Sequence, residues 1–264
     1  MSALPLSYVD LVVATLLISV AGGVSAALKL GLGGRLLTAS LRSVLQLGLI
    51  GFVLEWVFAL ERWYLVLAVF ASMVINAGIA AVQRTERRFA GIWQTGLWSV
   101  TLSSVVTTFV VVEVVIGVTP WYSPRYVIPL LGMVLGNALT GLSLTLDRVM
   151  ADLDEKRDQV EGRLALGATV WQACRPHVRE AVRLGMVPVL NSMAVVGIVS
   201  LPGMMTGQIL GGASPVEAVK YQLVVMFMIA CATSLGTMTA AVLSFRYLVT
   251  SDHQLDVRRL RKRK

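Results

Sequence analysis

Charged residues are scarce in this sequence, and their scarcity excludes a water-soluble fold. Only 14% of the 264 residues are Asp, Glu, Lys or Arg, whereas 56% are hydrophobic. The mean hydropathy of +0.75 is far above that of an ordinary soluble domain. A chain of this length holds about six to eight membrane-spanning helices, and little remains for a separate soluble domain.

Cysteine and histidine are also rare, with two residues of each type. Cys174 lies in a polar segment and Cys231 in an apolar one, which disfavours a disulfide and a thiolate metal cluster. We interpret His177 and His253 as bystanders, because neither falls in an apolar segment. The sequence also lacks a GxxxxGK[ST] motif, so we expect no nucleotide and no cofactor on this chain.

Long apolar segments predict an all-α integral membrane protein of about seven transmembrane helices. One transmembrane permease domain then occupies residues 1–264, with a polar segment near 147–185 and a basic tail at 249–264. We place the spans at 11–28, 41–60, 63–82, 98–118, 126–146, 186–210 and 221–248.

The basic residues fall mostly on one side of these spans. The linkers and the tail of that side hold 20 of the 23 Lys and Arg residues. By the positive-inside rule that side is cytoplasmic, which puts the N-terminus outside and the C-terminus inside the cell membrane. The net charge of +8 is dispersed among apolar runs, so we expect anionic lipid rather than nucleic acid as its partner.

Few ionisable residues fall deep within the predicted spans. Glu55 and Glu113 lie within about two turns of the outer ends, where a carboxylate reaches the headgroup region or lines an outward vestibule. The sequence has no buried carboxylate pair and no histidine relay. This pattern disfavours an ion-coupled carrier or channel, which remains the alternative class of function.

The sixth span, NSMAVVGIVSLPGMMTGQILGG, is the most irregular. Proline beside glycine predicts a break near residues 201–203, and broken helices are tolerated where they line a cavity. A kink that only serves helix packing is the alternative. Soft-metal binding by Met193, Met204 and Met205 is disfavoured, because methionine commonly fills gaps in apolar packing. The candidate translocation-path residues are Asn191, Pro202, Gly203, Met204, Met205, Thr206, Gly207 and Gln208.

The polar segment 147–185 is predicted to be helical rather than a loose loop. The fifth helix should continue into it and stop at Gly167, and Thr169 with Gln172 predicts a capping box that starts another helix. With a bend at Pro176, two short helices parallel to the membrane would form a rigid knob. An amphipathic helix resting on lipid is the alternative. The apolar residues expected to be exposed on the knob are Leu164, Leu166 and Trp171.

Several motifs resemble a known transporter family. EGRLALGATVWQA is similar to the EAA loop of ABC importer permeases, with Glu161 and Gly167 in frame and Gly162 and Arg163 in place of alanines. Together with PLLGMVLGNALTGLSLTLDR and LPGMMTGQILGG, it resembles the FetB family of iron-export permeases, over residues 39–246. Plant aluminium-tolerance permeases belong to the same broader group.

This resemblance implies a non-catalytic membrane subunit that dimerises and exports iron or another metal. A separate FetA-like ABC ATPase would bind ATP and Mg and hydrolyse the nucleotide. If a metal passes, its candidate oxygen ligands are Glu55 and Glu113, together with Asn191, Thr206 and Gln208, paired across the dimer axis. Because the spans hold so few charges, a chelated or organic substrate is the alternative. A membrane scaffold without transport is a third alternative, but it would not need a broken helix. The ATPase-coupling residues would be Glu161, Gly162, Arg163, Leu164, Ala165, Leu166, Gly167, Ala168 and Trp171.

Overall fold

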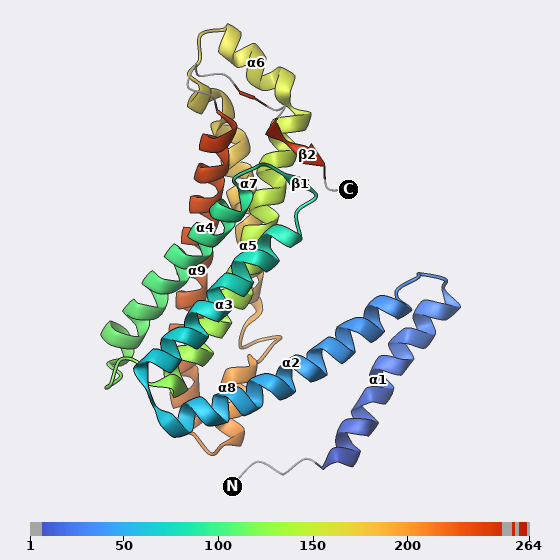
Figure 1. Ribbon diagram of the computed structural model, residues 1–264, viewed down its shortest axis with the longest axis vertical. Helices are drawn as coiled ribbons and strands as arrows, with labels where there is room; N and C mark the ends of the chain where they lie inside the picture. Colours follow the sequence, from blue (N-terminus) through green and yellow to red (C-terminus); the bar gives the residue numbers. More distant parts are fainter. Residues whose placement is uncertain (1–6, 250–254, 257–258, 263–264) are drawn as a thin grey trace.

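The computed structural model describes residues 7–249, 255–256 and 259–262, and nearly all of them are helical (Figure 1). This confirms the all-α prediction. The first elements are α1 (Tyr8–Ala27), α2 (Gly33–Leu60), α3 (Trp63–Gln83), the short strand β1 (Arg87–Arg88), α4 (Ile92–Phe109) and the π-helix η1 (Val110–Ile116). The others are α5 (Pro124–Glu155), α6 (Arg157–Ala165), α7 (Val170–Val195), α8 (Gly203–Leu210), α9 (Pro215–Leu248) and the strand β2 (Arg261–Lys262).

Six helical segments of the described chain are long and apolar enough to cross a membrane. They correspond to six of the predicted spans, with α4 and η1 forming one of them. The remaining prediction, 186–210, is not a single helix, because α7 ends at Val195 and α8 starts only at Gly203. The break is therefore confirmed, but it begins several residues before Pro202.

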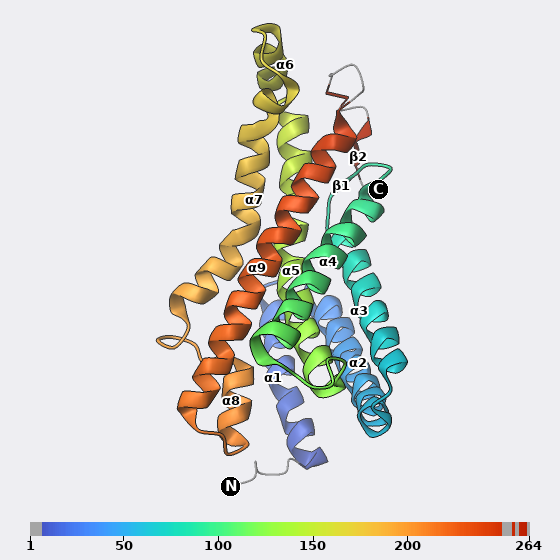
Figure 2. The ribbon, with the colours of Figure 1, turned by 90° about the vertical axis from the view of Figure 1, so that its left-hand side faces the viewer.

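Helix α5 lies at the centre of the bundle and contacts α3, α4, α7 and α9 (Figures 1 and 2). Residues of α5 contribute to two clusters of buried apolar residues. One includes Met150 and Val160 and lies toward α6, and the other includes Val57 and Val127 and lies toward α8. We call these two ends of the bundle the α6 end and the α8 end. The long helices run between them.

Helices α1 and α2 form a hairpin that stands away from the bundle (Figure 1). Val57 is the only buried residue among the residues of α2, whereas Phe52 on the same helix is 77% exposed. Such apolar surface is unfavourable in water but not against lipid tails or another apolar helix. The hairpin therefore depends on a membrane or a further helix to cover it.

The polar segment at the α6 end follows the prediction in part. Helix α5 ends at Glu155 and a separate helix, α6, carries the chain to Ala165, so the prediction of one helix that stops at Gly167 is wrong. Gly167 adopts a φ of +88°, and Thr169 forms the predicted capping box with Gln172. The expected second short helix is wrong, because α7 passes Pro176 and Pro188 and extends over 26 residues. Its buried face packs on α5, and we infer that this packing outweighs the backbone hydrogen bonds that the prolines remove.

The described residues of the C-terminal tail lie on the protein at the α6 end. Strand β2 pairs antiparallel with β1, which joins the tail to the loop between α3 and α4. Arg259 donates a hydrogen bond to the Tyr247 carbonyl at 2.8 Å. These contacts attach the described part of the basic tail to the bundle, and its contact with lipid stays a prediction.

Candidate functional site

The α6 corner, residues 156–171, is buried at its base and exposed at its tip. Within it, Val160 is fully buried, while Leu166 at the tip is 89% exposed. The backbone N–H of Gly167 donates to the Leu164 carbonyl at 2.9 Å, and that of Ala168 donates to the Arg163 carbonyl at 3.1 Å. The corner is thus held by its own hydrogen bonds, and its tip is available to another molecule.

The predicted coupling residues are mostly exposed on this corner, although their role remains a prediction. Glu161, on the outer side of α6, forms an ion pair with Arg157, and the Arg163 side chain bonds the Ala173 carbonyl. The residues Gly162, Ala165, Leu166 and Gly167 are exposed. Leu164 and Ala168 are half-buried, so the prediction of an exposed Leu164 is only partly correct. Trp171 is 43% exposed and packs edge-on against Phe245.

A buried ionic cluster lies at the base of the α6 corner. The Asp152 carboxylate, 1% exposed, lies 2.8 Å from Lys156 Nζ and 3.2 Å from Arg148 Nε. His177 is also buried, with Nδ1 3.9 Å from the same carboxylate. Burial lowers the pKa of His177, which Asp152 opposes in part, whereas the cations Lys156, Arg163 and Arg148 favour the lowering. The sequence analysis missed this cluster, although the i,i+4 spacing of Arg148, Asp152 and Lys156 indicates it.

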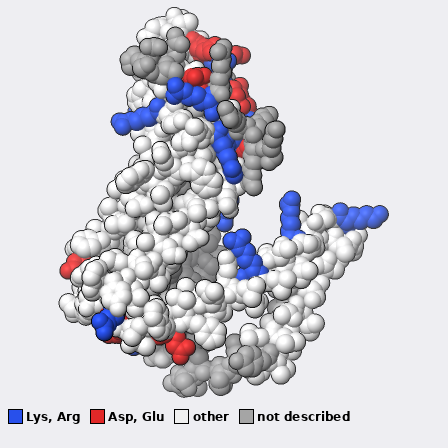
Figure 3. Space-filling model, viewed as in Figure 1, with Lys and Arg blue, Asp and Glu red and all other residues white. Residues whose placement is uncertain are grey.

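The other groups at the α6 end serve structure. Arg87 pairs with Asp154 at 3.1 Å and with Glu155 at 2.8 Å, which ties the α3–α4 loop to the end of α5. Cys174 is buried, and burial raises the pKa of its thiol to about 11, so it is protonated at neutral pH. On the face shown in Figure 3, Lys and Arg side chains gather at this end and along the α1–α2 turn, while the bundle surface between the two ends is largely uncharged.

Two cavities of about 420 Å³ each lie beside the break between α7 and α8, and Met133 and Met204 line both. The first, the Gln222 cavity, also contacts Pro202 and Gly203. The second, the Gln208 cavity, contacts Arg125 and Tyr221. Part of the predicted path is thus brought together with residues of α5 and α9. The sequence analysis did not propose Met133, Asn137, Ser192 or Gln222 as path residues, although the first three lie within segments that it singled out.

The remaining path and metal candidates are placed elsewhere. Asn191 and Gly207 are exposed, Met205 is half-buried, and the Thr206 hydroxyl donates to the Pro202 carbonyl at 3.1 Å. Glu55 on α2 and Glu113 on η1 are exposed, and neither lines the Gln222 or the Gln208 cavity. Within the described part of the chain, no three His, Cys, Asp or Glu residues come together as metal ligands. Metal binding by the two glutamates therefore remains a prediction.

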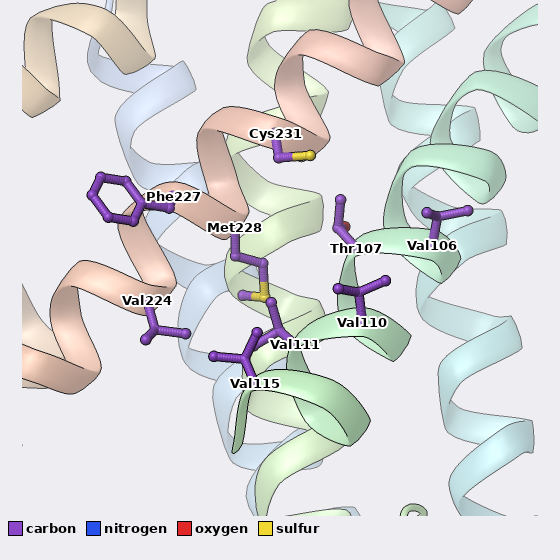
Figure 4. A pocket seen from close by; sticks show the side chains of 9 residues that line it. All are labelled: Val106, Thr107, Val110, Val111, Val115, Val224, Phe227, Met228 and Cys231. Atoms are coloured by element: carbon purple, nitrogen blue, oxygen red, sulfur yellow. The ribbon is translucent and has the colours of Figure 1, made fainter. Parts of the chain in front are cut away.

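A third hollow, the Cys231 groove, lies between α4–η1 and α9 (Figure 4). Its walls are almost entirely apolar, with Val111, Phe227 and Met228 among them. The Thr107 hydroxyl, which faces this groove, already donates to the Ser103 carbonyl at 2.6 Å. The groove thus presents an apolar surface of the kind that lipid tails or a neighbouring helix cover.

The family model described as an uncharacterised protein family (UPF0014) matches residues 8–249, nearly the whole chain. The chain belongs to this family. Among its relatives, a protein of Escherichia coli named probable iron export permease protein FetB is 33% identical over 254 residues, which cover 96% of each chain. The chain is thus a FetB-like, multi-pass membrane protein, in agreement with the resemblance seen in its motifs.

Plant members of the family are similar at the same level. The Arabidopsis thaliana protein ALUMINUM SENSITIVE 3 is 39% identical over 227 residues, covering 86% of this chain and 82% of its own. The rice membrane protein STAR2 is 36% identical over 245 residues, covering 93% and 85% respectively. No solved structure matches the chain.

Proposed function

We propose that this protein is the membrane subunit of an ATP-driven exporter whose cargo is iron or another metal. A separate FetA-like ABC ATPase would hold ATP and Mg and perform the hydrolysis, and two copies of the permease would form the transport unit. The name of the Escherichia coli relative supports iron as the cargo. The α6 end would face the cytoplasm across the cell membrane, because most basic residues lie there or in the α1–α2 turn.

The α6 corner is the observation that carries this proposal. An ATPase outside the membrane moves membrane helices only through a stiff contact. The corner is directly continuous with α5 and α7, which pack against each other along the bundle. The buried Asp152 cluster stiffens its base, while the 89% exposed Leu166 offers an apolar anchor for a groove on a partner.

Co-purification with the ATPase tests the proposal. The tagged permease and a FetA-like ATPase of the same organism would be expressed together, and the ATPase activity of the complex measured in lipid nanodiscs. Leu166→Asp should reduce complex formation at least tenfold, because a charge would be placed in an apolar contact. Leu30→Asp serves as a control, since Leu30 is an exposed leucine in the α1–α2 turn, away from the corner.

A further variant separates docking from coupling. Gly167→Val would strain the positive φ of the corner without meeting another group, so it should change the direction of α6 and lower substrate-stimulated ATPase activity. If the permease binds no ATPase and moves metal in liposomes without ATP, the proposal is wrong. An ion-coupled carrier would then be the better description.

A further inference from the structure

The Gln222 cavity exists because the chain breaks between α7 and α8. The turn at 196–202 replaces one or two turns of helix, with Gly197 at a φ of +82° and its N–H donating to the Ser200 carbonyl at 2.9 Å. The space left open is about 420 Å³ and is bordered by α5, α7, α8, α9 and the turn itself. It lies in the half of the bundle nearer the α8 end, as shown by Gln222 in the second turn of α9.

An unpartnered polar atom marks this cavity as a binding site. Gln222 is only 7% exposed and lines the cavity, yet its Oε1 has no hydrogen-bond partner among the described residues. A buried amide oxygen without a donor is unfavourable, and such atoms are rare in folded proteins. A molecule in the cavity that carries an N–H or O–H group would satisfy it. Gln208 is half-buried on the wall of the adjoining cavity, and its Oε1 also has no hydrogen-bond partner in the described part of the chain.

The lining of the Gln222 cavity disfavours a dehydrated metal cation. Among the described residues, its walls carry thioethers, amides, hydroxyls and aliphatic groups, but no charged side chain. A divalent or trivalent ion that loses its water in such a site gains no compensating charge, so its transfer is strongly unfavourable. The thioethers of Met133, Met204 and Met226 instead provide a polarisable apolar surface.

The size of the cavity leads to the same conclusion. A volume of about 420 Å³ falls within the range of roughly 300–1,000 Å³ that is typical of small-molecule sites. A single ion would contact only part of the wall and could not be coordinated from several sides at about 2 Å. A molecule with several non-hydrogen atoms would fill the space and reach both Asn137 and Gln222.

We propose that the Gln222 cavity binds a small molecule of no net charge that carries hydrogen-bond donors and apolar surface. A metal that passes through the cavity does so as a neutral complex, with its charge cancelled by its own ligands. This inference rests on the proposed transport function, for which it specifies the form of the cargo. Gln222 accepts a hydrogen bond from that molecule, and the methionines pack against its apolar part.

Equilibrium dialysis of the purified full-length permease in detergent, without any ATPase, tests this proposal. The probes are tris(acetohydroxamato)iron(III), a neutral complex with N–H donors and methyl groups, together with anionic ferric citrate, aqueous iron(II) and free acetohydroxamic acid. Bound iron is measured by elemental analysis and bound acid by radiolabel. The neutral complex should bind saturably, and the two charged forms should not. Binding of the free acid as tightly as the complex would show that the site recognises a metal-free solute.

Two variants test whether the neutral complex binds in the Gln222 cavity. Gln222→Leu should weaken binding of the neutral complex about tenfold, through loss of one hydrogen bond to a buried group. Ser192→Phe, which fills the cavity from α7, should abolish binding without removing a buried amide. Gln94→Leu and Met238→Leu are matched controls on exposed positions of α4 and α9 and should bind as the unaltered protein does. Thermal unfolding of each variant shows whether it is folded.

The outcomes distinguish this inference from the proposed function. Equal binding by Gln222→Leu, Ser192→Phe and the unaltered protein would overturn the cavity assignment, as would Gln222-dependent binding of aqueous iron(II) or ferric citrate. In that case an intact, ATP-coupled permease–ATPase complex would leave the transporter proposal standing. Conversely, specific binding of the neutral complex by a permease that recruits no ATPase would support the site and contradict the transporter.

Discussion

At the scale of single residues, a glycine pair controls how closely α5 and α7 approach. A Cβ atom added to Gly185 would lie 2.0 Å from Thr145 Oγ1 and 2.7 Å from the Gly141 carbonyl oxygen. Thr145 is fully buried and bonds the Gly141 carbonyl at 2.9 Å, so it cannot move aside freely. Only glycine fits at position 185 in this packing.

We therefore expect Gly185→Ala to destabilise the bundle by about 1–3 kcal/mol, because one helix must shift. Gly136→Ala is the control, since a Cβ atom there meets nothing within 4 Å. Alanine at that exposed helical position should be neutral or slightly stabilising. Thermal unfolding in detergent measures both variants, and equal melting temperatures would contradict the close packing of α5 and α7.

His177 predicts a pH dependence of stability. Because burial lowers its pKa in the folded protein, the unfolded chain takes up a proton at higher pH than the folded one does. Stability should therefore fall as the pH drops from the ordinary histidine pKa of about 6.5 through the lower folded value. Above that pH window, the contribution of His177 to the free energy of unfolding is fully present. His177→Asn should show a smaller loss of melting temperature between about pH 7.5 and pH 5.5, and an unchanged loss would contradict the assignment.

At the scale of elements, ion pairs hold the loop between α3 and α4. Arg87 is largely buried and reaches Asp154 and Glu155 at the end of α5. Arg87→Ala should cost about 1 kcal/mol and loosen the β1–β2 pair, because the loop loses its link to α5. Arg84→Ala, at an exposed position of the same loop, is the control. Faster tryptic cleavage of this loop in the Arg87 variant alone is the expected result.

The helix breaks show how element boundaries depend on packing. Gly167 and the Thr169–Gln172 capping box could be predicted, because they act within a few residues of the chain. The continuation of α7 through Pro176 could not be predicted in the same way. The face of α7 that carries Ala173, Cys174 and Ala181 is fully buried, and contacts with α5 maintain the helix through the proline. Local rules for proline do not include this tertiary contribution.

At the scale of the whole molecule, the charge distribution predicts the orientation in the membrane. In a background with Cys174→Ala and Cys231→Ala, a membrane-impermeant maleimide should label Ala213→Cys in intact cells. It should label Leu166→Cys only after the membrane is opened, because Leu166 lies at the α6 end and Ala213 at the other. The reverse pattern would contradict the positive-inside assignment and the proposed site of ATPase contact.

The exposed face of the α1–α2 hairpin predicts where the two copies of the proposed dimer contact each other. Phe52 and Leu45 on α2 are more than 70% exposed, so a second copy of the chain can pack against this face. Phe52→Cys should cross-link between copies in native membranes, whereas Leu166→Cys at the tip of the α6 corner should not. Absence of a cross-link along α2 would mean that lipid covers the hairpin.

The sequence by itself determined the class of protein, the positions of the six long apolar helices, the charge asymmetry and the glycine corner at residue 167. These features depend on hydrophobicity, on the sign of charges and on hydrogen bonds between near neighbours. Only the tertiary structure decided that Asp152 and His177 share a buried cluster, and that Gln222 lies beside Met133 and Met204 around one cavity. Such residues are far apart in the chain, and contact between packed helices depends on side-chain shape, which periodicity does not encode.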